Sequence, residues 1–290
     1  MKISLAKAMG SCFGVDDAVE MAMDHPEAED LTILGQLVHN PQTVNRLKSK
    51  GIRLAEGIDA IDSIETKNVM ITAHGAADKI KEKVVEAGFN LFDATCPLVQ
   101  HVHRTIKRMV KKGYFPIVIG EEKHVEVKGI VGDLEEYLVI KDASDLDHLS
   151  PEKRLKLGIV SQTTQNHQNV NKVARDIEAR EDVQDIKFFN TVCKPTQERQ
   201  SAVEELSDNV DIMIVVGGKN SSNTRKLKLL GDKKGISSYH IESSDELKIS
   251  WFEGKKHVGI TAGTSTPFNV IDSIHESIRE LTDKLEAGQK

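Results

Sequence analysis

FNLFDATCPLVQHVHRTI, residues 89–106, decides the fold because a cysteine stands where one hydrophobic pattern gives way to another. The short apolar run before Cys96 is typical of a β-strand. After the cysteine, Val99, Val102 and Ile106 recur at the spacing of an α-helix. The stretch therefore predicts a strand, a cysteine and a helix in direct succession.

The other two cysteines, Cys12 and Cys193, lie in the same context. Strand-like runs precede them, KISLAKAMGSC and IKFFNTVC, and apolar residues at helical spacing follow both. The three cysteines divide the chain into near-thirds, which indicates three similar parallel α/β domains arranged pseudo-threefold around a common centre. The expected domains are residues 13–96, residues 97–193, and residues 194–290 completed by the N-terminal strand 1–12.

The rest of the chain alternates between short apolar runs and helical patterns, which is typical of α/β folds with parallel strands. No low-complexity segment or Pro/Ser-rich linker separates them. The predicted strand and helix pairs are 30–35 with 41–51, 68–75 with 77–88, 156–164 with 168–179, 211–223 with 224–232, and 257–267 with 268–285. The predicted strand 114–120 leads instead into a loop that resumes near residues 124–134.

The composition excludes several classes of protein. The 290 residues are 39% hydrophobic and 29% charged, with a net charge of −6, which argues against nucleic acid and anionic membranes as partners. The first residues lack the apolar core of a signal peptide, and the apolar runs are too short to span a bilayer. We expect a cytoplasmic protein. Three cysteines in such a compartment favour thiol, metal or catalytic roles over a disulfide framework.

Three thiolates from separate loops suit an iron–sulfur cluster bound through three of its irons, with the fourth iron open to a ligand. A single buried cysteine usually packs as a small apolar residue, but three in matched contexts argue against that interpretation. Zinc held by three sulfurs is the weaker alternative, because the sequence has no C-x-x-C pair.

Polar side chains gather at the other predicted strand ends, where ligands of parallel α/β folds bind. Each also has an ordinary interpretation as a helix cap, a loop histidine or a solvated face. These candidate residues are His39, His74, His124, Glu126, Thr163, Thr164, Ser221, Ser222, Asn223 and Ser265.

Hydroxyls, an amide, histidines and helix N-termini together favour an anion site. The chain has no P-loop and no convincing G-x-G-x-x-G motif, so a small diphosphate is a better ligand than a nucleotide. Glu126 follows His124 by two residues on an expected extended segment, which would put both side chains on one side. We expect Glu126 to be the proton donor, with Thr163 or Thr164 relaying through water.

The quoted motifs resemble the LytB/IspH family of hydroxymethylbutenyl diphosphate reductases, which act in the non-mevalonate isoprenoid pathway. The resemblance runs nearly end to end through CFGV, VHN, AHG, DATCP, HVEV, QTT, TQERQ, GGKNSSNTRKL and TAGTSTP. It implies a three-domain trefoil around one [4Fe-4S] cluster on Cys12, Cys96 and Cys193, with one open iron for the substrate hydroxyl. The implied reaction is a two-electron, two-proton loss of water that gives isopentenyl and dimethylallyl diphosphates.

The resemblance also implies residue roles and partners. Glu126, His124 and Thr163 would be catalytic, Glu126 as proton donor and Thr163 beside the substrate hydroxyl. A ferredoxin or flavodoxin would supply electrons singly. Val125 departs from the family pattern, where proline is common. The diphosphate would be surrounded by His39, His74, His124, Ser221, Ser222, Asn223 and Ser265, with Thr163 and Thr164 nearby.

Two alternatives stay open at the level of the sequence. Quinolinate synthase also combines three cysteines, pseudo-threefold architecture and an open cluster iron, although NSSN and HVEV argue against it. A non-enzymatic iron–sulfur sensor is the alternative from another class, and it would need no proton donor at Glu126.

Overall fold

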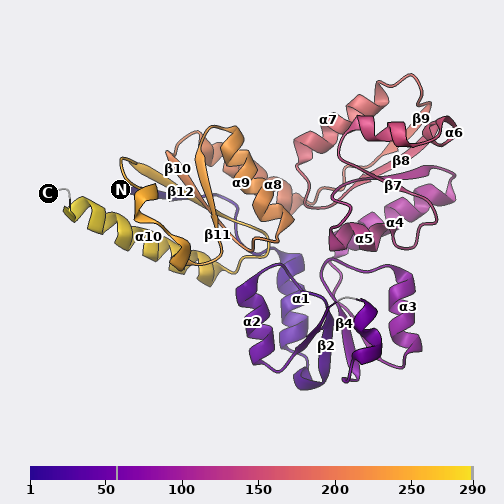
Figure 1. Cartoon of the computed structure of the whole chain (residues 1–290), viewed down its shortest axis with the longest axis horizontal. Coiled ribbons are helices and arrows are strands. Elements are labelled where there is room, and N and C mark those ends of the chain that lie inside the picture. Colours follow the sequence, from indigo (N-terminus) through magenta and orange to yellow (C-terminus); the bar gives the residue numbers. More distant parts are fainter. Residues whose placement is uncertain (57, 289–290) are drawn as a thin grey trace. The chain divides into compact units, whose positions relative to one another are not determined.

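The computed structural model describes residues 1–56 and 58–288 and contains three four-stranded, all-parallel β-sheets with helices packed on them (Figure 1). The expected α/β fold with parallel sheets is confirmed. Among the described residues, no helix combines the length and apolarity needed to cross a bilayer. The chain forms two compact units, one with Met1–Val15, His39–Val44 and the residues from Lys194 onward, the other with Asp16–Val38 and Asn45–Cys193.

The first sheet has the strand order β3-β2-β4-β5. Helices α1 and α2 lie on one face and α3 on the other (Figure 1). Val69 of β4 and Val84 of α3 are fully buried in the core between that helix and the sheet. The elements are α1 Phe13–Met23, η1 Ala28–Asp30, β2 Leu31–Leu34, α2 Pro41–Ser49, β3 Arg53–Ala55, η2 Ile58–Ser63, β4 Asn68–Ile71, α3 Asp78–Glu86 and β5 Asn90–Asp93.

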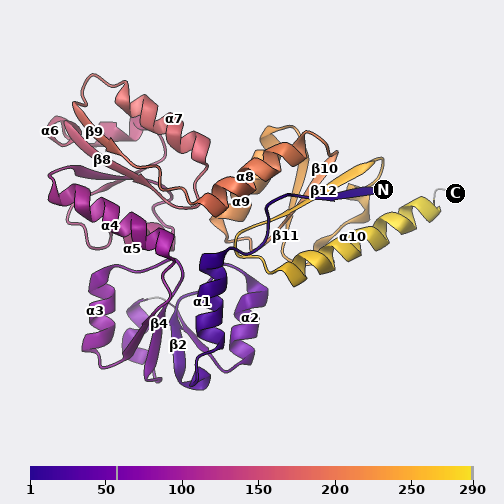
Figure 2. The ribbon, with the colours of Figure 1, turned by 180° about the vertical axis from the view of Figure 1, so that it is seen from behind.

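The second sheet has the order β7-β6-β8-β9, and its strands bury side chains on both faces. Val118 and Val160 pack against α4 and α5, which lie side by side (Figure 2). Ile117 and Ile159 point the other way, towards α7. The elements are α4 Pro97–Lys111, β6 Phe115–Ile119, α5 Val125–Val131, β7 Leu138–Ile140, η3 Ala143–His148, α6 Pro151–Arg154, β8 Lys156–Ser161, α7 His167–Glu178 and β9 Asp185–Phe188.

The third sheet joins the two ends of the chain in the order β1-β12-β10-β11. β1 pairs with β12 in parallel, so the N-terminal strand completes a sheet made by the last third of the chain. Met213 and Val215 pack towards α8 and α9, and Ile212 and Ile214 towards α10. The elements are β1 Lys2–Leu5, α8 Lys194–Ser207, β10 Ile212–Val216, α9 Ser222–Lys233, β11 Ser237–Ile241, η4 Ser244–Glu246, η5 Ile249–Trp251, β12 His257–Ala262 and α10 Phe268–Gly288.

All three sheets share one topology, in which the second strand lies at an edge, followed by the first, third and fourth. The fourth strands are β5, β9 and β1, and each leads into a cysteine and then a helix. The predicted succession of strand, cysteine and helix is confirmed at Cys96, Cys193 and Cys12. The residue boundaries proposed for three domains stay a prediction.

The expectation that HVEV is extended was wrong. His124 is the N-cap of α5, and Glu126 lies in the first turn of that helix. The imidazole Nδ1 of His124 accepts a hydrogen bond of 3.2 Å from the amide of Glu126, which satisfies one of the unpaired donors at the helix start. Val127, Ile130 and Val131 then bury one face against the sheet at helical spacing.

Replacing Val125 by proline should stabilise the protein. Val125 is the first residue of α5 and is 37% exposed, and proline is well tolerated at that position. The preceding His124 has φ −70° and ψ 138°, the conformation that a residue before proline prefers. We expect Val125→Pro to raise the free energy of unfolding by about 0.4–1 kcal/mol in urea titrations. A destabilised Val125→Pro protein beside an unaffected Val125→Ala control would contradict this account.

Candidate functional site

The backbone holds all three cysteines in the same way. Each cysteine amide donates a hydrogen bond to the carbonyl of the second residue beyond the third strand of the same sheet. The pairs are Cys12 with Thr264 at 3.2 Å, Cys96 with Ala73 at 3.1 Å, and Cys193 with Thr163 at 3.0 Å. Each cysteine corner is therefore tied to the end of the strand beside it.

The same hydrogen bonds hold polar candidate residues beside the cysteine corners. The residues that directly follow the three acceptors Ala73, Thr163 and Thr264 are His74, Thr164 and Ser265, all of which are candidate site residues. The cysteine side chains are half-buried, and none of the three forms a disulfide. A candidate site residue and a cysteine thus belong to one backbone arrangement in every sheet.

Glu126 is held by Thr163. The residue is 2% exposed, and its carboxylate accepts the Thr163 amide at 2.6 Å on Oε1 and the Thr163 hydroxyl at 2.8 Å on Oε2. The interpretation of HVEV as a solvated face is therefore wrong. Because the carbonyl of Thr163 accepts from Cys193, one threonine connects the buried acid to a cysteine corner.

His74 and His124 lie close together in the same unit. Their ring centroids are 5.8 Å apart, with 76° between the ring planes. Since Nδ1 of His124 accepts the Glu126 amide hydrogen, a neutral His124 carries its proton on Nε2. This tautomer offers a ring N–H donor for an anionic ligand.

In the other unit, the loops carrying His39 and Ser265 meet. The Ser265 hydroxyl donates to the His39 carbonyl at 3.2 Å. The backbone of Gly218 also lies close to this carbonyl, since a Cβ atom at that position would be 2.3 Å from the same oxygen. Burial lowers the pKa of His39 below its ordinary value of 6.5, and the neighbouring Arg225 guanidinium lowers it further, so both effects favour the neutral imidazole.

The start of α9 provides donors for an anion. The Ser221 hydroxyl caps this 12-residue helix by accepting from the Thr224 amide at 3.3 Å, and Lys226 donates to the Ser222 hydroxyl at 2.5 Å. Asn223 is 1% exposed, and neither amide atom of its side chain has a hydrogen-bond partner among the described residues. A buried amide left unpaired at a helix N-terminus suits a ligand with acceptor oxygens.

Arg199 is a structural residue that the sequence interpretation missed. The residue is 6% exposed, and its guanidinium donates to the carbonyls of Gly10 and Ser11 on the Cys12 corner, at 2.7 Å and 3.0 Å. It also donates to the carbonyl of Pro195, in the first turn of its own helix α8, at 2.9 Å. The arginine was hidden within the TQERQ motif, because an isolated arginine in a helical pattern is usually a surface residue.

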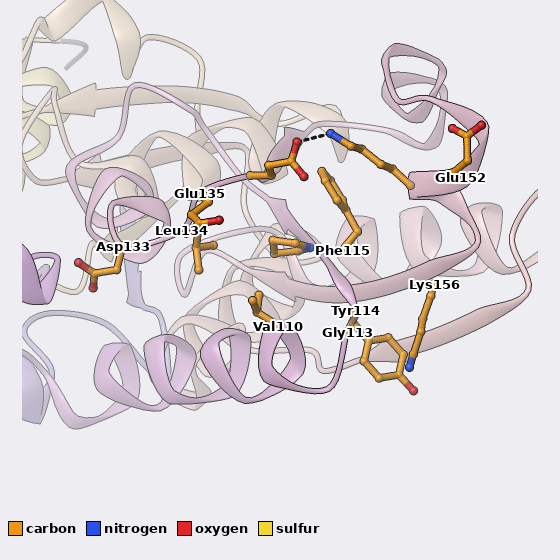
Figure 3. A pocket seen from close by; sticks show the side chains of 12 residues that line it. Val110, Gly113, Tyr114, Phe115, Asp133, Leu134, Glu135, Glu152 and Lys156 are labelled. Carbon is orange, nitrogen blue, oxygen red and sulfur yellow. Dashed lines mark hydrogen bonds and ion pairs between the residues drawn. The ribbon is translucent and has the colours of Figure 1, made fainter.

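A groove at the start of β6 does not contain the candidate site. It encloses about 590 Å³ and is lined by Tyr114, Phe115 and several acidic residues (Figure 3). Lys153 and Glu136, which also line the groove, form an ion pair with each other. The groove lies at the opposite end of β6 from His124, and it contains none of the predicted site residues.

The predicted site residues fall into two groups. The described residues contain no set of three or more His, Cys, Asp or Glu side chains close enough to hold a single metal ion. The first unit holds Cys12, His39, Ser221, Ser222, Asn223 and Ser265, and the second holds His74, Cys96, His124, Glu126, Thr163, Thr164 and Cys193.

Comparison with known proteins identifies the family. The model of the family described as LytB protein matches residues 3–279. The chain belongs to the LytB family. This assignment confirms the resemblance drawn from the motifs and disfavours the quinolinate synthase alternative.

Relatives in the LytB family match nearly the whole chain. The 4-hydroxy-3-methylbut-2-enyl diphosphate reductase of Aquifex aeolicus is 37% identical over 287 residues, covering 97% of this chain and 97% of the relative. The enzyme of the same name from Geobacter sulfurreducens is 37% identical over 285 residues, covering 98% and 99%. The match therefore includes every candidate region, from Cys12 to Ser265.

Two solved structures are also similar to this LytB chain. A structure of (E)-4-hydroxy-3-methyl-but-2-enyl diphosphate reductase, described as the terminal enzyme of the non-mevalonate pathway, is 36% identical with a TM-score of 0.67 and covers 97% of this chain and 100% of its own. The reductase from Plasmodium falciparum is 24% identical with a TM-score of 0.87, covering 97% and 88%. Because its sequence identity is below 25%, the similarity to the Plasmodium falciparum structure supports the fold alone.

Removing the Arg199 guanidinium should loosen the Cys12 corner. Arg199→Met would leave the carbonyls of Gly10 and Ser11 without their buried donor, at a cost of about 2–4 kcal/mol. Hydrogen exchange should accelerate in peptides covering residues 8–13, and urea titration should show the lost stability. Unchanged exchange in Arg199→Met, matching an Arg46→Met control at an exposed helical arginine, would contradict this role.

His103 should make the protein sensitive to acid. It is 8% exposed in α4 and its Nε2 has no partner among the described residues. Burial, assisted by Lys81 and Lys107, lowers its pKa from 6.5 to about 4. Between those values the unfolded chain binds a proton that the folded chain does not, so the His103 contribution to stability falls as pH falls.

Urea titrations of His103→Gln and the unaltered protein measure this effect. We expect the unaltered protein to lose about 2 kcal/mol more than His103→Gln between pH 7 and pH 5. The exposed residue His101, on the same helix, provides the control variant His101→Gln. Equal pH dependence of His103→Gln and the unaltered protein would refute the assignment.

Proposed function

We propose that this chain is a 4-hydroxy-3-methylbut-2-enyl diphosphate reductase, an oxidoreductase acting in the terminal step of the non-mevalonate pathway. Membership of the LytB family and near-complete coverage of reductases with this name support the proposal. The structural observation that carries it is the buried Glu126 carboxylate, hydrogen-bonded twice to the residue that also anchors Cys193. A binding protein or sensor has no need of such a buried acid.

The reaction breaks the allylic carbon–oxygen bond of the substrate hydroxyl. Two electrons and two protons enter, one oxygen atom leaves as water, and isopentenyl and dimethylallyl diphosphates form. The chain's side chains must therefore hold a diphosphate, exclude bulk water and supply protons. The electrons require a cofactor and an external donor.

For the cofactor, we infer one [4Fe-4S] cluster held by Cys12, Cys96 and Cys193, with one iron lacking a protein ligand. The donor set fits, because all three half-buried thiols lie on corners with the same amide-to-carbonyl hydrogen bond. Thiolates are the usual ligands of such clusters. When bound, the cluster supplies single electrons and a Lewis-acidic iron.

Two groups of residues are proposed to bind the diphosphate. Asn223 offers an unpaired buried amide, and the α9 N-terminus favours negative charge. His124 offers its Nε2–H, and neutral His39 also offers one ring N–H. His74, Ser221, Ser222, Thr164 and Ser265 complete the proposed set.

Glu126 and Thr163 form the proposed proton path. The Thr163 hydroxyl now donates to Glu126. When Glu126 carries a proton, the direction reverses: the carboxyl donates to the Thr163 oxygen, and the threonine hydrogen is free to point at the departing hydroxyl. The pair can then pass a proton from Glu126 to the leaving oxygen, while His124 holds the Glu126 backbone in place.

The proposal also includes the domain boundaries, the electron donor and the cellular compartment. Three domains, residues 13–96, 97–193, and 194–290 with 1–12, are proposed to surround the cluster pseudo-threefold. A ferredoxin or flavodoxin is the proposed electron donor, in the cytoplasm. Two reduced donor molecules, each giving one electron, balance one turnover.

Direct turnover tests the function. Anaerobically prepared, cluster-replete protein should consume 4-hydroxy-3-methylbut-2-enyl diphosphate with reduced methyl viologen as electron donor. Chromatography with mass spectrometry should identify two five-carbon diphosphate products that have lost the hydroxyl. A cluster-replete protein that leaves the substrate intact would sink the proposal and favour the sensor alternative.

Replacing Glu126 by glutamine should abolish most turnover. The amide keeps the shape of the carboxyl but cannot cycle a proton, so we expect kcat to fall about 10²–10⁴-fold. Iron content and substrate affinity, measured by calorimetry, should change little. Glu122→Gln is the matched control, since Glu122 lies exposed four residues earlier, in the turn that leads into α5. Normal turnover by Glu126→Gln would refute the proton-delivery role.

A further inference from the structure

The helix that follows Cys96 has an unusual charge. α4, Pro97–Lys111, contains no Asp or Glu, although the chain as a whole has a net charge of −6. His101, Arg104, Arg108 and Lys111 are all exposed. Their spacing of three, four and three residues puts them on one face of the helix. This stripe begins one turn beyond the cysteine.

The charges of the stripe are not neutralised within the protein. Among the described residues, Arg108 and Lys111 have no ion-pair partner, and Arg104 contacts only the neutral Gln100, at 3.4 Å. Lys107, one position off the stripe, differs because it pairs with Asp78 and Asp133 at 2.5 Å and 2.6 Å. The stripe therefore presents net positive charge to solvent.

The helices at the other two cysteines do not share this property. α1, after Cys12, has no Lys or Arg but carries Asp16, Asp17 and Glu20. In α8, after Cys193, Arg199 is buried and Lys194 lies 3.7 Å from Glu198. Of the three helices that follow a cysteine, α4 is therefore the one with an uncompensated basic face among the described residues.

The helix dipole explains only some of the basic residues of α4. Basic residues in a last turn are favourable, which accounts for Arg108 and Lys111, as it does for Arg46 and Lys48 in α2. It does not account for Arg104 in the middle of α4 or for the absence of acidic residues. A requirement for positive charge along the whole exposed face accounts for all of these.

We propose that this stripe is the docking surface for the electron donor, an acidic one-electron carrier protein that approaches the Cys96 corner. The inference rests on the proposed function, which requires two such donors to be oxidised for each water released. From Cys96 to Lys111 the helix rises about 22 Å, enough to contact a small redox protein. Weak redox complexes have small interfaces, and their encounter is steered by opposite charge.

Charge reversal on the stripe tests the proposal with a matched control. The test variant is Arg108→Glu with Lys111→Glu, and the control is Arg46→Glu with Lys48→Glu, which alters the same charges in the last turn of α2. The donor is a plant-type [2Fe-2S] ferredoxin kept reduced by its reductase. At low ionic strength, KM for ferredoxin should rise about tenfold or more in the test variant only, and the difference should shrink in high salt.

Two further measurements separate docking from chemistry. Turnover with methyl viologen should be equal in the test variant and the unaltered protein, because this small donor needs no protein surface. Binding of oxidised ferredoxin to cluster-replete protein, followed by surface plasmon resonance, should weaken in parallel with KM. This binding measurement decides the docking proposal even if the protein fails to reduce the substrate, which is an outcome that refutes only the proposed function.

Three results would overturn the proposal. The first is unchanged ferredoxin binding in the test variant, and the second is equal weakening in the control. The third is affinity for a DNA duplex as high as that for ferredoxin, which would identify the stripe as a general polyanion surface.

Discussion

Three backbone hydrogen bonds, one at each cysteine, are the constraint on which the rest of the site depends. Each connects a cysteine amide to the carbonyl of a residue just beyond the neighbouring strand. The segment that carries the cysteine and the loop that follows the third strand are thereby held together. The backbone of both segments is fixed beside the thiol. A catalytic site needs this preorganisation, because loops that are not tied together sample many conformations.

The second sheet shows how much follows from one such bond. Thr163 accepts the Cys193 amide through its carbonyl and donates its amide and hydroxyl to Glu126. Glu126 in turn donates its amide to His124, which caps α5. A cysteine, a threonine, a buried acid and a histidine are consequently positioned by consecutive hydrogen bonds, and the acid is shielded from water without losing its polar partners.

Much of the fold was predictable because buried parallel strands and amphipathic helices leave strong hydrophobic patterns. The strand, cysteine and helix units and the closing role of the N-terminal strand were among these predictions. The edge strands β3, β7 and β11 were missed, because they are short or polar. HVEV was misjudged because two polar residues spaced by two fit a strand and also fit a helix cap followed by a first turn.

The chain's own sequence determined the α/β class, the repeated cysteine corners and the identity of the chemical groups, since periodicity and residue type are local properties. Only the tertiary structure decided that Glu126 is buried against Thr163, that Asn223 has an unpaired amide, and that Arg199 donates to the carbonyls of Gly10 and Ser11 at the Cys12 corner. These facts depend on contacts between residues far apart in the chain. Burial and hydrogen-bond partners are set by how helices and strands pack, which no local pattern records.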